Sequence, residues 1–156
     1  MITDSALQFG DALPDGGALL GLDIGTKTIG MATCDAGWRY ASPDKTLARG
    51  KFAKDSAALR ELATKRTVKG IVIGLPLNMD GSEGPRAQAS RAYARNLSQA
   101  LDLPILLWDE RWSTASADHA MIGQDMSRAK RAEKIDSHAA AVILQNAIDT
   151  MAGGAF

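Results

Sequence analysis

An apolar segment interrupted by a single carboxylate places the strongest constraint on how this chain folds. Residues 18–24 read Ala-Leu-Leu-Gly-Leu-Asp-Ile, and a turn-forming sequence at 25–28 leads into a second, largely apolar run at 29–34. Short apolar runs joined by a tight turn predict a buried strand with a hairpin partner. Asp23 then lies inside a core strand, where an uncompensated carboxylate is costly to desolvate. Either the amides of the following turn or a bound metal ion must stabilise its charge.

The rest of the chain predicts a mixed sheet covered by helices. Residues 38–47 favour a third, edge-like strand, because Pro43 cannot donate to a sheet ladder. Further short strands are predicted at 71–73 and 104–108. Helices are predicted over residues 51–67, 85–101, 113–122 and 135–150. Three leading strands followed by alternating helix and strand predict an α/β fold with a mixed five-stranded sheet.

Length and composition predict one globular domain. The chain has 156 residues, of which 46% are hydrophobic, which is enough to bury a core. Residues 1–17 contain three aspartates but no lysine or arginine, unlike a targeting signal, so we expect a flexible acidic leader before a domain at 18–152. Cys34 is the only cysteine, which excludes an internal disulfide and fits the cytoplasm. No apolar run is long enough to predict a membrane partner.

Acidic residues recur where predicted strands or helices begin and end. Asp109 and Glu110 follow the strand at 104–108, where adjacent side chains point to opposite faces, so their spacing does not choose between them. Asp136 opens the last predicted helix, a position that also suits an ordinary first-turn aspartate. Carboxylates converging from several elements would form an oxygen-only site of the kind that Mg²⁺ or Mn²⁺ prefers. Two such ions can activate water and stabilise the leaving oxygen in phosphodiester hydrolysis.

Four motifs occur in one order along the chain. They are Leu-Asp-Ile-Gly-Thr-Lys-Thr-Ile-Gly at 22–30, Gly-Leu-Pro-Leu-Asn-Met-Asp-Gly-Ser at 74–82, Asp-Glu-Arg-Trp-Ser-Thr at 109–114 and Lys-Ile-Asp-Ser-His-Ala-Ala at 134–140. In these motifs the chain resembles the YqgF family, also called RuvX. The resemblance implies an RNase H-like fold related to Holliday junction resolvases. It also implies a nuclease that matures the 5′ end of pre-16S ribosomal RNA during ribosome biogenesis.

The resemblance also assigns a site. It implies that Asp23, Glu110 and Asp136 are the catalytic, metal-binding acids, and it favours Glu110 over Asp109. Glu133 would share a helix face with Asp136 if the last helix begins early, which makes it a candidate fourth ligand; otherwise it is a solvated surface glutamate.

Basic and polar residues near these acids are predicted to contact substrate, with solvated loops and turns as the alternative interpretation of the same residues. The predicted substrate-binding residues are Lys27, Asn78, Ser82, Arg86, Arg111, Arg128, Lys130, Arg131 and Lys134.

Other functions remain open at this point. The sequence at 23–27 also resembles the phosphate-binding opening of actin-like ATPases and sugar kinases, but those enzymes close two domains around nucleotide and this chain supplies one. A non-catalytic RNA-binding factor in ribosome assembly is a second alternative. Branched DNA is an alternative substrate, because it also presents phosphate backbone and the chain has no base-reading motif.

Overall fold

The computed structural model describes residues 1–112 and 128–153, and it describes the side chains of residues 1–111 and 137–152. The described strands are β1 (Ile2–Thr3), β2 (Ala18–Ile24), β3 (Thr28–Cys34), β4 (Ala41–Ala48), β5 (Val68–Leu75) and β6 (Ile105–Asp109). The helices are α1 (Ala6–Asp11), α2 (Phe52–Arg66), α3 (Pro85–Leu101), the 3₁₀ turn η1 (Glu110–Trp112) and α5 (Arg128–Gly153). The sheet order is β1-β6-β5-β2-β3-β4.

The strand directions confirm the predicted mixed sheet. β2, β3 and β4 pair antiparallel, while β5 runs parallel to both β2 and β6. The tight β2–β3 turn is closed by the Gly25 amide, which donates to the Thr28 carbonyl at 2.8 Å. The carboxyl ends of β2, β5 and β6 therefore lie along one edge of the sheet, where ligand sites of parallel strands gather.

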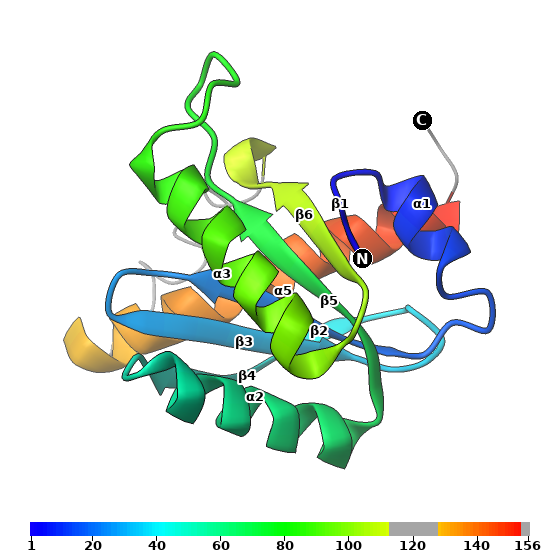
Figure 1. Cartoon of the computed structure of the whole chain (residues 1–156), viewed down its shortest axis with the longest axis horizontal. Helices are drawn as coiled ribbons and strands as arrows, with labels where there is room; N and C mark the ends of the chain where they lie inside the picture. Colours follow the sequence, from blue (N-terminus) through cyan, green and yellow to red (C-terminus); the bar gives the residue numbers. More distant parts are fainter. Residues whose placement is uncertain (113–127, 154–156) are drawn as a thin grey trace.

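The two faces of the sheet are covered by different helices (Figure 1). One core cluster combines Leu20, Leu22 and Ile24 with residues of α2 and α3. The other contains Leu19 and packs against α1 and α5. Because side chains alternate along a strand, Asp23 projects to the α5 face.

Helix α5 crosses that face toward the end of β2. A Cβ atom built on Gly21 would lie 2.8 Å from Leu144 Cβ, so the missing side chain lets the helix approach the sheet closely. About two turns before Leu144, toward the start of α5, the buried Ser137 Oγ lies 2.9 Å from Thr46 Oγ1. Thr46 pairs with Gly30, and Gly30 pairs with Asp23. The α5 backbone next to Ser137 therefore passes close to the level of Asp23 in the sheet.

The expectation of a flexible leader at residues 1–17 is wrong for most of that segment. β1 pairs parallel with β6 and adds a sixth strand to the five that we expected. Phe9 of α1 is fully buried and Leu13 nearly so, both in the cluster beneath α5. Burial of these two side chains stabilises the ordered segment.

Replacing Phe9 by alanine is expected to lower the free energy of unfolding by about 3 kcal/mol, because a fully buried aromatic ring leaves a cavity. Leu7→Ala is the matched control on the same helix, since Leu7 is 76% exposed and its loss should cost less than about 0.5 kcal/mol. Urea unfolding of the two variants checks the difference. Equal, small effects would mean that the segment is loose after all.

The last helix begins earlier than expected. We predicted residues 135–150, whereas α5 starts at Arg128 and ends at Gly153. The polar, basic residues at its start lack the apolar periodicity that marks a helix in sequence. The helix predicted over 113–122 lies outside the described residues. Among the residues that are described, no helix is long and apolar enough to cross a membrane.

Candidate active site

Two acids from separate strands meet at the carboxyl edge of the sheet. Asp23 is the next-to-last residue of β2, and Glu110 directly follows β6 in η1. Their side chains are hydrogen-bonded to each other, and both are half-buried. A hydrogen bond between two carboxyl groups requires a shared proton, so the metal-free pair carries less than two full negative charges.

Gly74 makes this meeting possible. β5 lies between β6 and β2, and Gly74 pairs with Trp108 near its carboxyl end. A Cβ atom on Gly74 would lie 2.8 Å from both Cγ and Cδ of Glu110, and 2.7 Å from Ile143 Cδ1. Without that atom, the Glu110 side chain lies across the β5 backbone and reaches Asp23. The sequence gives no sign of this role, although Gly74 opens the motif at 74–82.

The environment of Glu110 favours its protonated form. Burial, the charge of Asp23 and the hydrogen bond with Asp23 raise the pKa of Glu110 from 4.5 to about 8, whereas the charge of Arg86 lowers it. Two half-buried carboxylates in contact repel each other when both are charged, and a cation between them would relieve that repulsion. An all-oxygen donor pair of this kind fits Mg²⁺ or Mn²⁺.

The raised pKa has a consequence for stability in the absence of metal. The unfolded chain releases the Glu110 proton near pH 4.5, whereas the folded protein keeps it up to about pH 8, so stability falls as the pH rises between these values. Glu110→Gln removes this loss of stability at high pH, because the glutamine side chain has no proton to release in this range. We expect the variant to be more stable than the wild type by about 2 kcal/mol at pH 9, and by much less at pH 5.

Urea unfolding in the presence of a chelator measures the difference at both pH values. A gain of the same size at pH 5 and pH 9 would contradict the shared proton. Glu61→Gln serves as the control for loss of an exposed glutamate.

The neighbouring Asp109 faces a different partner. Its carboxylate accepts hydrogen bonds from Arg111 Nε at 2.9 Å and from Nη2 at 2.6 Å. This ion pair holds the pKa of Asp109 below its usual range. The structure thus resolves what spacing left open: Glu110 faces Asp23, and Asp109 faces Arg111.

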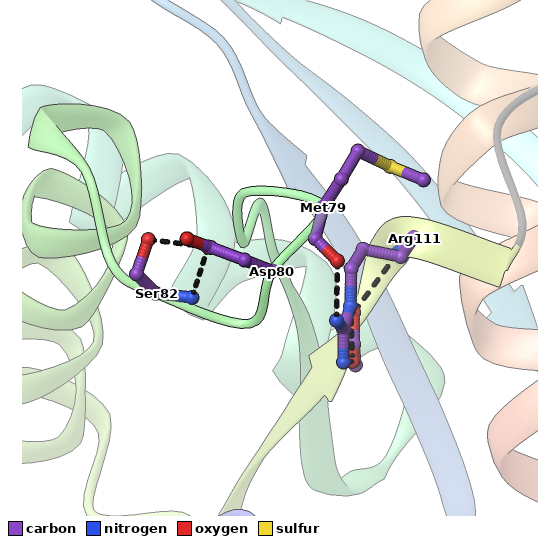
Figure 2. A network of polar contacts seen from close by, with 5 residues as sticks. Met79, Asp80, Ser82 and Arg111 are labelled. Carbon is purple, nitrogen blue, oxygen red and sulfur yellow. Dashed lines mark hydrogen bonds and ion pairs between the residues drawn. The ribbon is translucent and has the colours of Figure 1, made fainter.

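Arg111 also connects η1 to the loop that follows β5. Its Nη1 donates to the Met79 carbonyl at 3.2 Å, as Figure 2 shows. Within the loop, Asp80 Oδ1 accepts from the Ser82 amide at 2.9 Å and from the Ser82 hydroxyl at 2.6 Å. Asn78 Nδ2 donates to Ser82 Oγ at 3.0 Å. These contacts give the exposed loop a defined shape beside the acid pair, and they engage three of the residues predicted to bind substrate.

Two other predicted substrate-binding residues lie at the end of β2. Arg86, in the first turn of α3, donates from Nη2 to the Ile24 carbonyl at 2.6 Å and is close enough to affect the pKa of Glu110. Lys27 is exposed in the β2–β3 turn. The structure therefore places the Arg86 guanidinium at the end of β2, on the α3 side of the acid pair.

The remaining predicted residues belong to the start of α5. The backbone of Asp136 and Glu133 is helical, so their three-residue spacing is a helical one, but both side chains lie outside the described part. The same holds for the four basic residues Arg128, Lys130, Arg131 and Lys134. Among the described side chains, no group of three potential metal ligands occurs. The third acid thus stays a prediction.

The mixed sheet with helices on both faces, and with two acids at its carboxyl edge, defines the class of the protein as RNase H-like. Among solved structures, Thermus thermophilus RuvC in complex with a Holliday junction substrate matches with a TM-score of 0.54 at 10% identity, over 88% of this chain and 96% of RuvC. That likeness shows the fold. The chain belongs to the RuvX family, described as Holliday junction resolvase, whose profile matches residues 17–150.

Relatives of known name are close in sequence. A protein of Novosphingobium aromaticivorans is 66% identical over 156 residues, covering 100% of both chains. One from Sphingopyxis alaskensis is 64% identical over 151 residues, covering 97% of this chain and 99% of its own length. Both carry the name "Putative pre-16S rRNA nuclease".

Proposed function

We propose that this protein is a metal-dependent nuclease that hydrolyses phosphodiester bonds of precursor 16S ribosomal RNA. The observation that carries the proposal is the hydrogen-bonded pair of Asp23 and Glu110 at the carboxyl edge of the sheet. The names of the relatives support the choice of RNA. The lone buried thiol of Cys34 fits a cytoplasmic location, where such a precursor is found.

Asp23 and Glu110 would hold Mg²⁺ or Mn²⁺, with Asp136 as the third ligand and Glu133 as a candidate fourth. Divalent metal bound there supplies an activated water and neutralises charge on the leaving oxygen. The chain itself contributes orientation. Gly74 leaves room for Glu110, and the Asp109–Arg111 ion pair fixes the turn from which Glu110 projects. Lys27 and Arg86 would attract the phosphate backbone toward the acids.

A second candidate substrate is branched DNA, which the family description favours. The two substrates present the same phosphate chemistry, and they differ in helix geometry and in the 2′-hydroxyl. The described site shows no base-reading arrangement that would choose between them.

The test offers the purified full chain a precursor 16S rRNA fragment and a four-way DNA junction in parallel, each with Mg²⁺, with Mn²⁺ and with chelator. We expect metal-dependent cleavage of the RNA. Cleavage of the junction alone would identify branched DNA as the substrate, while the proposal of metal-dependent phosphodiester hydrolysis would stand. Tight RNA binding without cleavage under any condition would support the non-catalytic assembly factor instead and refute the proposal.

A further inference from the structure

Two guanidinium groups meet consecutive peptide units directly after Asp23. Arg86 Nη2 donates to the Ile24 carbonyl at 2.6 Å, and Arg49 Nη1 donates to the Gly25 carbonyl at 2.7 Å. Arg49 comes from the segment that follows β4, whereas Arg86 comes from the start of α3. Segments far apart in the sequence therefore bring two cations to the same end of β2.

The Arg49 side chain is held in place from several directions. Its backbone amide donates to the Lys27 carbonyl at 2.9 Å, which ties it to the β2–β3 turn. Its guanidinium carbon lies 5.2 Å from the centre of the Tyr93 ring, within cation–π range. The next residue, Gly50, donates its amide to both oxygens of Asp55, each at 3.1 Å, and Asp55 is buried. An arginine fixed in this way loses little conformational entropy when it binds a ligand.

Both guanidinium groups lie along helix α3. Arg86 and Tyr93 are seven residues apart in this helix, which places them on the same face, two turns and about 10 Å apart along the axis. Arg49 lies over the second of these positions. The pair thus forms a short basic track along α3 that begins beside the acids.

No carboxylate among the described side chains forms an ion pair with Arg49. Three other arginines form ion pairs, namely Arg66 with Asp44, Arg91 with Glu83 and Arg111 with Asp109. Among the side chains that the structure describes, Arg49 and Arg86 have no such ion pair, and their printed hydrogen bonds go to main-chain carbonyls. Arg49 is also exposed. A carbonyl dipole orients a guanidinium without cancelling its charge, so most of its planar donor set stays available for an anion.

We propose that Arg49, together with Arg86, binds the phosphate backbone of the nucleic acid beside the bond that is cut. The guanidinium forks suit phosphate oxygens, and their place after Asp23 sets the strand across the acid pair. This inference rests on the proposed function, and it adds a contact on the α3 side of the site. The alternative is that Arg49 only braces the β2–β3 turn.

The salt dependence of binding separates these two roles. Each phosphate contact releases counterions, so the logarithm of the affinity falls with the logarithm of the salt concentration by about 0.7 to 0.9 per contact. With chelator present to prevent cleavage, Arg49→Gln is expected to bind a precursor rRNA fragment roughly tenfold more weakly and to reduce that slope by nearly 1. Arg49→Lys should keep most of the slope, because it keeps the charge.

Arg66→Gln is the matched control, since Arg66 is paired with Asp44 and should leave the slope unchanged. Urea unfolding of each variant shows that it is folded before binding is measured. An unchanged slope in folded Arg49→Gln, with a reduced slope in Arg86→Gln, would overturn the inference and leave the nuclease proposal intact. A reduced slope in a protein that cuts no substrate would support the contact while refuting the nuclease.

Discussion

Replacing Asp23 by asparagine or Glu110 by glutamine is expected to slow phosphodiester cleavage by about a thousandfold or more while the protein stays folded. Each substitution keeps the size of the side chain but removes a charged oxygen that the metal needs. Asp23 comes from β2 and Glu110 from η1, so each acid approaches the shared site from a different element and neither can take the place of the other. Single-turnover cleavage of the precursor rRNA fragment at saturating Mg²⁺ measures the loss.

Two aspartates serve as controls for this result. Asp109→Asn removes a carboxylate next to Glu110 that is paired with Arg111, and it should cost far less than either site variant. Asp44→Asn removes a carboxylate on the edge strand β4 and should leave the rate unchanged. If Asp109→Asn abolished cleavage while Glu110→Gln did not, the assignment of the two acids would be reversed.

The second large effect is expected from Gly74→Ala, a change of one methyl group. The new Cβ would be 2.8 Å from two atoms of Glu110 and 2.7 Å from Ile143 Cδ1, so the Glu110 side chain or α5 must move. We expect a stability loss of about 1 to 3 kcal/mol from overpacking. Displacing a metal ligand by about an ångström should also slow cleavage on the order of a hundredfold.

Gly10→Ala is the control for the added methyl group. Among the described residues outside its own helix, a Cβ atom there would meet only Met151 Sδ, at 3.9 Å, and alanine favours the helical backbone of α1. Its stability should be equal to or above that of the wild type, with an unchanged cleavage rate. Normal cleavage by Gly74→Ala would show that Glu110 does not need the path across β5.

Asp23 could be predicted as a site residue from the sequence, because a carboxylate inside an apolar strand requires a compensating partner. The partner itself could not be named from the sequence, because Glu110 lies in η1, directly after β6 and 87 residues further along the chain. Spacing also could not decide whether Asp109 or Glu110 faces the site, since strand alternation says only that the two side chains point to opposite faces of the sheet. The local contacts of Arg111 decide the matter, because this arginine pairs with Asp109 and leaves Glu110 to turn toward β2.

The errors at the two ends of the chain have different causes. The charge of residues 1–17 predicts a loose leader, whereas Ser5 caps a helix there, with the Gln8 amide donating to Ser5 Oγ at 3.2 Å. Phe9 then packs into the core. At α5 the early start at Arg128 could not be predicted, because its first residues carry no apolar stripe. The role of Arg49 cannot be read from its sequence neighbours, because its contacts with the Gly25 carbonyl and the Tyr93 ring are made between segments far apart in the chain.

Anomalous diffraction from crystals of the full chain grown with Mn²⁺ tests most directly whether the acid pair is a metal site. We expect a manganese peak in contact with carboxylate oxygens of both Asp23 and Glu110, with the hydrogen bond between the two side chains broken. Manganese bound elsewhere, with the two acids still hydrogen-bonded to each other at saturating metal, would contradict this expectation.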